Sequence, residues 1–553
     1  DSQVGSDKFD QSARPVAPSN FPSAAVTKWN SVASLVLAMM LASLLVCLAA
    51  LLSAGASETH YGQGNHARAA ITEIPQDSGS NASVMASEAI ASEVVERSSA
   101  HLRGSSAKLQ LSDPDAGVQD ERRLVATELK PCAQKEDCLL LVDAFLSRQP
   151  RQQGPGKSLL QAYDSPPQGG GGPCGSLCYL KPRCVSDQCR YYIYDNAVAA
   201  IYFAHRGKLS EAKVILDSLK PLLYPKPGNV QLLYSGYAEN GDVLDWSIDT
   251  GNNAWVGMAF VHYSVASGDA CYRHIARDIL NSLADQAGCN DELQGFMGRL
   301  PRGEGKYRAT EHNIDMFALS RMLGAKELQG RAATFVSRMY GFSDHIPEAY
   351  ATGTAGKVIC DTSQDEGSPV AADTQFWNLL SDADPDADRK RTSLNSVLRP
   401  ASAGGLLADD TDIIGDRAHL TGVRFTTEGS GAQWENTASA VMGIGFYDSV
   451  YRAQGDISSH RASMQDSLLH QLAEYGAVLA SVRGGNYEAY TQGNSDPAFP
   501  GGSDTGLGWS YLRYPHLAAT AWTGLMLLEA NPFAPPSNGP PTTTVDPSCP
   551  ATP

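Results

Sequence analysis

The segment 309–315 places Glu311, His312 and Asp315 at the start of an apolar-periodic stretch. Thr310, just before them, is a residue type that caps helices, so the sequence predicts a helix whose first turn is acidic. Glu311 and Asp315 are four residues apart and therefore share one helix face. Two carboxyls on one face suit acid and base chemistry, although acids in a first turn also stabilise a helix dipole without any other role.

Polar clusters of the same kind open five further apolar-periodic stretches. They contain, in chain order, Asp195, Asp249 with Asn253, Asp373 with Gln375, Glu428 and His516. Successive clusters lie roughly 55 to 85 residues apart, which is room for two helices and a loop. Plainer amphipathic stretches fall between them, at 209–219, 271–283, 328–339 and 464–482. We therefore expect alternating inner and outer helices that bring the polar clusters to one face.

This pattern resembles the (α/α)6-toroid enzymes, which include many glycoside hydrolases, some polysaccharide lyases and sugar 2-epimerases. The resemblance covers residues 138–533 and rests on the motifs at 249–255, 310–315 and 518–533. It implies an all-α fold, an (α/α)6 toroid of helical hairpins. It also implies a carbohydrate-active enzyme that acts on a glycan and needs no cofactor.

Hydrolysis of a glycosidic bond generally uses one protonated carboxyl and one ionised carboxylate. We expect Glu311 to be the general acid, because burial beside Asp315 raises a carboxyl pKa. Asp249 is the first candidate for the base and Glu428 the second. Inversion is the expected stereochemical course, as in many toroid hydrolases.

The remaining polar and aromatic residues of the openings are candidates for substrate binding, since amides and carboxylates bind hydroxyls and indoles stack on sugar rings. The expected substrate-binding residues are Asp195, Asn253, Trp255, His312, Asp315, Asp373, Gln375, Trp377, Trp434, Trp509 and His516. Core packing is the alternative for the tryptophans, and we assign it to Trp522 and to about half of the others.

No metal site is expected. Glu311, His312 and Asp315 do not all share one helix face. The cysteines in 174–189 could hold zinc, but their spacings are not a strong zinc signature, and disulfides are the favoured interpretation. Two other functions suit the same fold, namely a polysaccharide lyase or sugar epimerase, and a non-catalytic glycan-binding domain. A lyase acting on uronates needs positive groups, which are scarce in the helix openings.

The charge balance excludes one class of partner. The chain has 60 acidic and 43 basic residues, a net charge of -17. Proteins that bind nucleic acids carry basic patches, and no dense run of Lys or Arg is present, so nucleic acid is not an expected partner. The oligomeric state stays open.

The stretch 31–54 is uncharged and rich in Leu, Ala and Val, and its roughly 24 residues suffice to cross a bilayer. Arg14 and Lys28 precede it whereas only Arg68 follows closely, which favours a cytoplasmic N-terminus. We expect a single-pass membrane protein whose C-terminal domain is extracellular or luminal. Secretion after signal cleavage is the alternative.

The expected organisation surrounds one large domain with tails. It comprises a polar tail at 1–30, the transmembrane helix at 31–54, a disordered stalk at 55–130, the catalytic toroid at 131–533 and a Pro/Thr-rich tail at 534–553. Within the toroid, the charged run 382–391 is expected to be a solvated loop.

Of the 11 cysteines, Cys47 alone lies inside the apolar stretch. The others are even in number, which fits disulfides in an oxidising compartment. Cys271 and Cys289 bracket an expected helix about 27 Å long, so each should pair elsewhere.

Overall fold

The computed structural model describes residues 132–154, 156–163, 190–226, 230–301, 305–343, 346–411, 418–451, 455–482, 502–508, 510–512 and 515–534. The expected transmembrane helix at 31–54, the stalk at 55–130 and the cysteine cluster at 174–189 lie outside these residues. No helix in the described ranges combines the length and the apolar character that crossing a bilayer requires.

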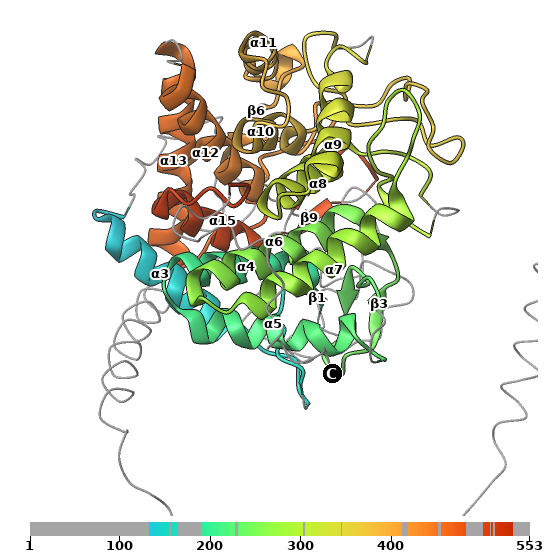
Figure 1. Cartoon of the computed structure of the whole chain (residues 1–553). Coiled ribbons are helices and arrows are strands. Elements are labelled where there is room, and N and C mark those ends of the chain that lie inside the picture. Colours follow the sequence, from blue (N-terminus) through green and yellow to red (C-terminus); the bar gives the residue numbers. More distant parts are fainter. Residues whose placement is uncertain are drawn as a thin grey trace, which may run out of the picture. The chain divides into compact units, whose positions relative to one another are not determined.

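In the described part of the chain, six helices form a closed inner ring in which each packs against two neighbours (Figure 1). Around the ring they are α4 (Ile193–His205), α6 (Thr250–Ser267), α8 (Thr310–Met322), α10 (Ala372–Ser381), α12 (Trp434–Tyr451) and α15 (Leu517–Leu528), which returns to α4. Inner helices are enclosed on all sides, and residues 197–203 of α4 are all fully buried. Such helices are apolar all round rather than along one stripe.

Outer helices alternate with the inner ones along the chain. They are α3 (Lys135–Arg148), α5 (Leu209–Leu223), α7 (Ala270–Ala287), α9 (Lys326–Met339), α11 (Ala387–Val397) and α13 (Gly455–Tyr475). Each of the last five packs on the inner helix before it, and α3 packs on α15. In α7, Tyr272, Ile279 and Leu283 belong to one buried stripe, as the amphipathic pattern predicts. These helix contacts form the expected (α/α)6 toroid.

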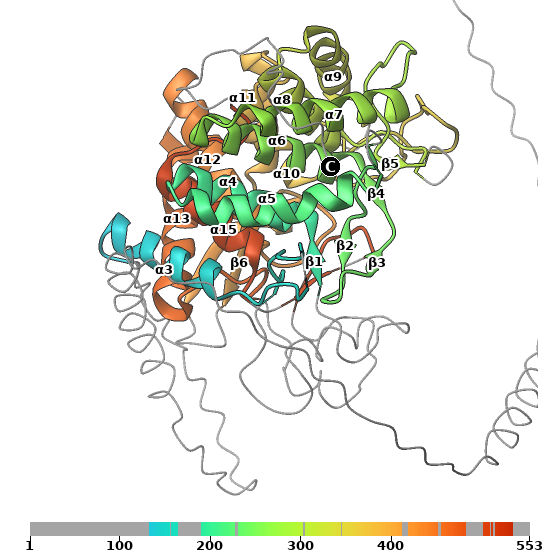
Figure 2. The same cartoon turned by 60° about the horizontal axis from the view of Figure 1, so that its bottom comes forward.

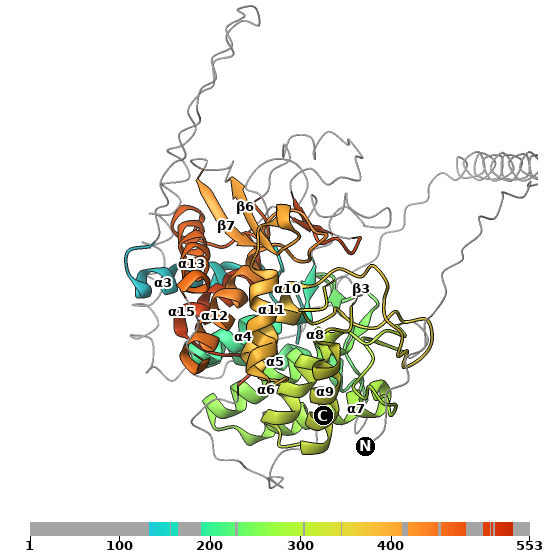
Figure 3. The same ribbon diagram turned by 90° about the horizontal axis from the view of Figure 1, so that it is seen from above.

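Short antiparallel strands in the connecting loops were not predicted from the sequence. They are β1 (Tyr191–Tyr192), β2 (Gly236–Tyr237), β3 (Val243–Asp245), β4 (Ile248–Asp249), β5 (Arg299–Leu300), β6 (Leu407–Thr411), β7 (His419–Val423), β8 (Gly502–Asp504) and β9 (Ser510–Leu512). β1 and β4 run directly into α4 and α6 (Figure 2), and the β6–β7 hairpin packs through β7 on α13 (Figure 3). Each of these strands has only two to five residues, which is too few for an alternation of apolar and polar residues to be recognised in the sequence.

The charged run 382–391 is not a loop throughout, which corrects the expectation, because α11 begins within it. The Asp386 carboxylate accepts hydrogen bonds from the backbone N–H groups of Asp388 and Arg389 and caps the helix. The Arg389 side chain lies 3.3 Å from Asp384. The charges in this run therefore stabilise a helix terminus.

The fourth residue of every inner helix is a polar residue that ties the helix to an extended segment. Asn313 of α8 accepts a hydrogen bond from the Phe296 N–H at 2.8 Å and donates one to the Phe296 carbonyl at 3.0 Å. Asn196, Asn253, Gln375 and Thr520 make the same pair of bonds to Leu160, Leu233, Tyr350 and Val478, and Thr437 accepts from the Val423 N–H. We call these six side chains the latch residues.

The segment after α15 returns to the centre of the ring. Phe533 is fully buried, and its ring centre lies 5.1 Å from that of Trp255 and 5.4 Å from that of Trp377. Arg321 donates to the Phe533 carbonyl at 2.9 Å, and Asn531 donates to a carbonyl of α10 at 2.8 Å. This segment therefore contacts α6, α8 and α10.

A disulfide joins Cys289 to Cys360, with 5.6 Å between their Cα atoms. Cys271 is also disulfide-bonded. The prediction that Cys271 and Cys289 do not pair with each other is therefore confirmed. Cys132 and Cys138 are free thiols.

We predict that Asn313→Ala lowers the free energy of unfolding by about 3 kcal/mol, because the buried N–H and carbonyl of Phe296 lose their partners. Denaturant unfolding of the purified chain measures the change. Ser463→Ala is the matched control, since Ser463 is exposed and bonds within its own helix. The control should change stability by less than about 0.5 kcal/mol. An equally small effect of Asn313→Ala would show that the latch is not a stabilising contact.

His262 of α6 makes stability depend on pH. Its Nε2 donates to the Pro532 carbonyl at 2.9 Å, and its Nδ1 accepts from His205 at 3.0 Å. Burial lowers its pKa from 6.5 to about 3, so the imidazole is neutral in the folded protein and is protonated only on unfolding. The stability that the neutral His262 provides is fully present above pH 6.5. It is lost as the pH falls, because the unfolded chain then binds a proton that the folded protein does not, and the loss is about 2 kcal/mol at pH 5.

We therefore predict that His262→Gln loses less stability than the wild type between pH 8 and pH 5, by about 2 kcal/mol. Unfolding curves at both pH values measure the difference. Ser463→Ala, at an exposed position of the outer helix α13, should keep the wild-type pH dependence. Identical pH dependence in the wild type and His262→Gln would refute the assignment.

Candidate active site

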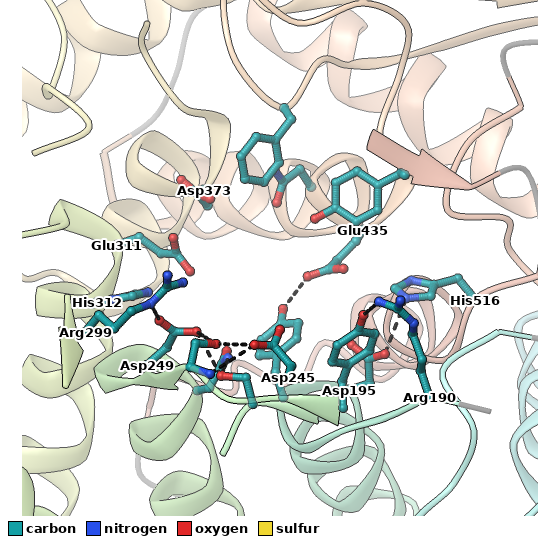
Figure 4. Close-up of a pocket in the computed structure, with 18 of the residues that line it drawn as sticks. Arg190, Asp195, Asp245, Asp249, Arg299, Glu311, His312, Asp373, Glu435 and His516 are labelled. Atoms are coloured by element: carbon teal, nitrogen blue, oxygen red, sulfur yellow. Dashed lines mark hydrogen bonds and ion pairs between the residues drawn. The ribbon is translucent and has the colours of Figure 1, made fainter. Parts of the chain in front are cut away.

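The first turns of the inner helices meet in one pocket of about 700 Å³ (Figure 4). Because the latch residues fix the fourth position of each helix, the second or third position of α4, α6, α8, α10 and α12 turns toward this pocket, and α15 contributes His516 just before its start. The second residues of α8, α10 and α12 that line it are Glu311, Asp373 and Glu435. Its carboxyl groups are Asp195, Asp245, Asp249, Glu311, Asp373 and Glu435, and its arginines are Arg190 and Arg299.

Glu311 stands in the pocket wall at the start of α8 and is half-buried. Burial is the main cause that raises the pKa of its carboxyl well above the ordinary range, and the neighbouring carboxylates of Asp373 and Asp315 add to it. The group therefore holds a proton at a pH where an exposed glutamate is ionised. This is the property that a general acid requires.

Glu435, the second residue of α12, is 5% exposed and was not predicted as a site residue. The Tyr194 hydroxyl donates to its Oε1, and the Trp522 indole N–H donates to the Tyr194 oxygen at 2.9 Å. Burial raises the pKa of Glu435 to about 7, against the lowering effects of His516 and the Tyr194 hydrogen bond. The carboxyl is thus able to gain or lose a proton near neutrality.

A signal for Glu435 existed in the sequence. It stands two residues before the latch residue Thr437, as Glu311 stands two before Asn313 and Asp373 two before Gln375. Figure 4 shows the Glu311 and Glu435 carboxyl groups facing the open space from opposite sides.

Asp249 lies at the N-cap of α6, and both of its oxygens are occupied. Oδ1 accepts from the Arg299 Nε at 2.8 Å, and Oδ2 accepts from the Ser235 and Ser247 hydroxyls at 2.8 and 2.9 Å. Burial alone would raise the pKa of Asp249, but His312 and Arg299 hold it below its ordinary value. An ionised carboxylate bound by three donors is a poor candidate for a base.

Asp195 and His516 form a pair on the α4–α15 side of the pocket, where Asp195 Oδ2 lies 3.4 Å from His516 Nε2. His516 also accepts from the Ala519 N–H and caps α15. Burial opposes protonation of His516, yet Asp195 and Glu435 raise its pKa above the ordinary value. The Tyr163 ring lies 4.5 Å from the imidazole, measured between ring centres.

The pocket floor is aromatic. Trp377 lines the pocket, and its ring centre lies 5.3 Å from that of Trp255 and 5.9 Å from that of Trp522. All three indoles are 2% exposed or less. Trp255 and Trp522 therefore support the floor from below, and Trp377 is the indole that the pocket reaches.

Seven of the predicted site residues line this pocket: Asp195, Asp249, Glu311, His312, Asp373, Trp377 and His516. Asn253 and Gln375 do not line it, because both are latch residues bonded to backbone. Trp255 and Trp434 are buried in the core, and Asp315 is buried below Glu311. Trp509 lies outside the described residues.

Glu428, the second candidate for the base, is exposed and is not among the residues that line the pocket. It lies in the turn at 427–431, ahead of α12, which begins only at Trp434. The close approach of Gly429 to the Asp504 backbone holds this turn, since a Cβ on Gly429 would lie 2.7 Å from the Asp504 carbonyl oxygen. The polar cluster at 427–431 and the first turn of α12 are therefore separate segments.

Among the described residues, the cluster that brings three possible metal ligands together is Cys289, Asp291 and Cys360. Its two sulfurs form the disulfide, so they are not available as thiolate ligands. Asp291 instead binds Arg308 at 2.7 Å.

No protein-family model and no curated protein matches the sequence. Similar solved structures include a wild-type glycosidase, with 12% identity, 72% of this chain and 98% of that chain covered, and a TM-score of 0.45. A family 76 glycoside hydrolase from a bovine Bacteroides thetaiotaomicron strain has 10% identity, 71% and 77% coverage and a TM-score of 0.47. A sugar epimerase from a ruminal bacterium has 11% identity, 71% and 98% coverage and a TM-score of 0.44.

These proteins belong to the (α/α)6-toroid enzymes, the group that the sequence pattern resembles. At identities of 12% or less, the likeness assigns neither a family nor an activity to this chain.

Proposed function

We propose that the chain is a glycoside hydrolase in which Glu311 is the general acid and Glu435 is the base. The observation that carries the proposal is the pair of carboxyl groups that enter one pocket from α8 and α12, both with raised pKa values. Glu311 keeps its proton more firmly and so protonates the leaving oxygen, whereas Glu435 ionises near pH 7 and activates water.

Inversion is the stereochemical course that we propose. α8 and α12 are not neighbours in the ring, since α10 packs between them. An inverting enzyme needs its two carboxyl groups about 6.5 to 9.5 Å apart, so that a water molecule fits between the base and the sugar. Glu311 and Glu435 face the pocket from opposite sides, which suits a pair that holds both a sugar and a water molecule between its members.

The remaining pocket residues suit an uncharged sugar. Six carboxyl groups face two arginines. Both arginines have partners, because Arg299 binds Asp249 and Arg190 donates to the Tyr192 hydroxyl at 2.7 Å. An anionic sugar would meet net repulsion, which argues against a uronate lyase. Trp377 supplies an apolar part of the pocket wall.

A sugar epimerase or isomerase is the second candidate, because His312 and His516 line the same pocket. Burial lowers the pKa of His312, which leaves it neutral and able to accept a proton. Such an enzyme would interconvert free monosaccharides and leave glycosidic bonds intact. A non-catalytic glycan-binding domain would do neither.

We also propose that the domain is tethered to a membrane and faces outward. The uncharged stretch 31–54 supports the tether, and the Cys289–Cys360 disulfide supports an oxidising compartment. Secretion after cleavage stays the alternative.

We predict that Glu311→Gln and Glu435→Gln each lower kcat by at least about 10²-fold on a hydrolysed glycan, because each removes one proton-transfer group. A panel of oligosaccharides identifies the substrate, and proton NMR of the first product gives its anomeric configuration. Glu428→Gln is the matched control and should retain wild-type activity, since Glu428 is exposed outside the pocket. Interconversion of free sugars without hydrolysis, or full activity of Glu311→Gln, would overturn the assignment.

We further predict that Tyr194→Phe moves the acid limb of the kcat profile to higher pH. The Tyr194 hydroxyl stabilises the charged form of Glu435, so its removal raises the pKa of that carboxyl above about 7. The base is then protonated over a wider range, and activity is lost mainly at low pH. A profile lowered by one factor at every pH would contradict this role of the hydroxyl.

A further inference from the structure

Trp246 differs in exposure from the other tryptophans of the described residues. Its side chain is 65% exposed, whereas those of Trp255, Trp377, Trp434 and Trp522 are exposed by 2% or less. An indole left in water forgoes the stabilisation that its burial would supply. Single exposed apolar residues are common on protein surfaces, so the surroundings of Trp246 decide whether it has a role.

Trp246 stands at the margin of the active-site pocket. It lies between Asp245 and Ser247 in the chain, and both of these residues line the pocket. Figure 4 shows Asp245 beside Asp249 in the pocket wall. Exposure rises along the chain from Asp249, which is 8% exposed, through the partly buried Ser247 to Trp246. This segment therefore runs from the pocket wall to the surface and places the indole beside the pocket.

Hydrogen bonds hold the backbone on both sides of the indole. Asp245 Oδ1 accepts from the Ser247 N–H at 3.1 Å and from the Ser247 hydroxyl at 2.8 Å. The Ser247 carbonyl accepts from the Ser235 N–H at 2.8 Å. The Tyr234 ring meets the indole at 68°, with 5.1 Å between the ring centres, and at this angle it covers at most one indole face. The indole thus has an open face on a segment with little backbone freedom left to lose on binding.

A sugar ring is the kind of ligand that these groups suit. The C–H face of a sugar packs against a flat indole, while its hydroxyls need hydrogen-bond partners. Asp245 Oδ2 accepts no hydrogen bond from the described residues, since the printed bonds of this carboxylate go to Oδ1. A carboxylate oxygen in the pocket wall is therefore available to a hydroxyl of a ligand that lies on Trp246.

The size of the pocket indicates how long such a ligand is. A volume of about 700 Å³ encloses a drug-sized molecule, which corresponds to about two sugar units. Further units of a glycan chain must then lie outside the pocket. Among the described residues, Trp246 is the exposed aromatic side chain at the pocket margin.

We propose that Trp246 forms an outer sugar-binding subsite, with Asp245 as its hydroxyl acceptor, for a neutral glycan longer than the part that the pocket encloses. The inference rests on the proposed function, because it takes the ligand of the pocket to be a glycan, and it adds the chain length of the substrate. Trp246 binds the substrate away from the reacting bond and transfers no proton. Its contact is equal in the ground state and the transition state, so it lowers KM and leaves kcat unchanged.

The test compares the binding of short and long oligosaccharides by calorimetry. The parent protein is the full chain carrying Glu311→Gln, which prevents cleavage during the measurement, and the probes are gluco-, manno- and xylo-oligosaccharides of two to six sugar units. Adding Trp246→Ala should weaken binding of the best-bound hexasaccharide about tenfold, the effect of exposing roughly 60 Å² of apolar surface. Binding of the disaccharide of the same series should change by less than about twofold, because the pocket alone encloses it.

Two further variants in the same background are controls. Trp246→Phe keeps a flat apolar ring and should weaken hexasaccharide binding by less than about threefold. Val214→Ala shortens an exposed apolar side chain on α5, outside the pocket, and should leave both affinities unchanged. Equal losses of disaccharide and hexasaccharide affinity in Trp246→Ala, or no loss of either, would overturn the inference.

Fluorescence measures the same contact independently. The difference in emission between the parent and its Trp246→Phe variant isolates the signal of Trp246, which acrylamide should quench because the indole is exposed. The bound hexasaccharide should protect this signal, and the bound disaccharide should not. Unchanged quenching with the hexasaccharide bound would also overturn the inference.

These measurements separate the subsite from the proposed function. If the wild type hydrolyses a glycan whose long and short chains bind equally well with and without the Trp246 indole, the subsite is refuted and the hydrolase stands. If Trp246→Ala loses affinity for long chains alone, while the wild type hydrolyses none of them, the subsite is supported and the hydrolase is refuted.

Discussion

The hydrogen bonds of the six latch residues are the constraint on which the site depends. A helix packed on all sides by apolar residues can rotate or slide by one residue at little cost in buried area. A side-chain amide that bonds both the N–H and the carbonyl of one distant residue does not allow this, because a shift would leave buried polar groups unpaired. Asn313 and its counterparts thus give each inner helix a fixed rotation. Residues one or two positions earlier are then directed into the pocket.

This division of labour explains how so many acids share a small volume. Asp249 is held ionised by Arg299 and hydroxyls, Asp195 is paired with His516, and Glu435 is bonded by Tyr194. Each carboxyl has a different partner, and the pKa values of Asp249 and Glu435 move in opposite directions. Divergent pKa values in neighbouring carboxyls are what acid and base catalysis requires.

The sequence predicted the alternation of helices because inner and outer helices differ in apolar pattern, and it placed Asp195, Asp249, Glu311 and Asp373 at helix starts that do meet. It did not predict Glu435. The polar cluster at 427–431 predicts a helix start, whereas α12 begins at Trp434. Only the tertiary contacts of the 427–431 turn distinguish it from a helix start. Asn253 and Gln375 were expected to bind substrate, since nothing local reveals that a buried amide has a backbone partner elsewhere. The short strands and the start of α11 were missed because elements of a few residues show no period.

The closure of the ring by α15 has a consequence for how the protein is made. α15 packs between α12 and α4, and α3, the earliest outer helix, packs on α15 as well. During synthesis, α3 and one side of α4 therefore wait for a partner that is made after the other five inner helices. Until then their apolar faces are open to water and to other chains, which is the state that chaperones bind. The ring can close only after α15 has been synthesised, and loss of this inner helix would affect the whole ring rather than one edge of it.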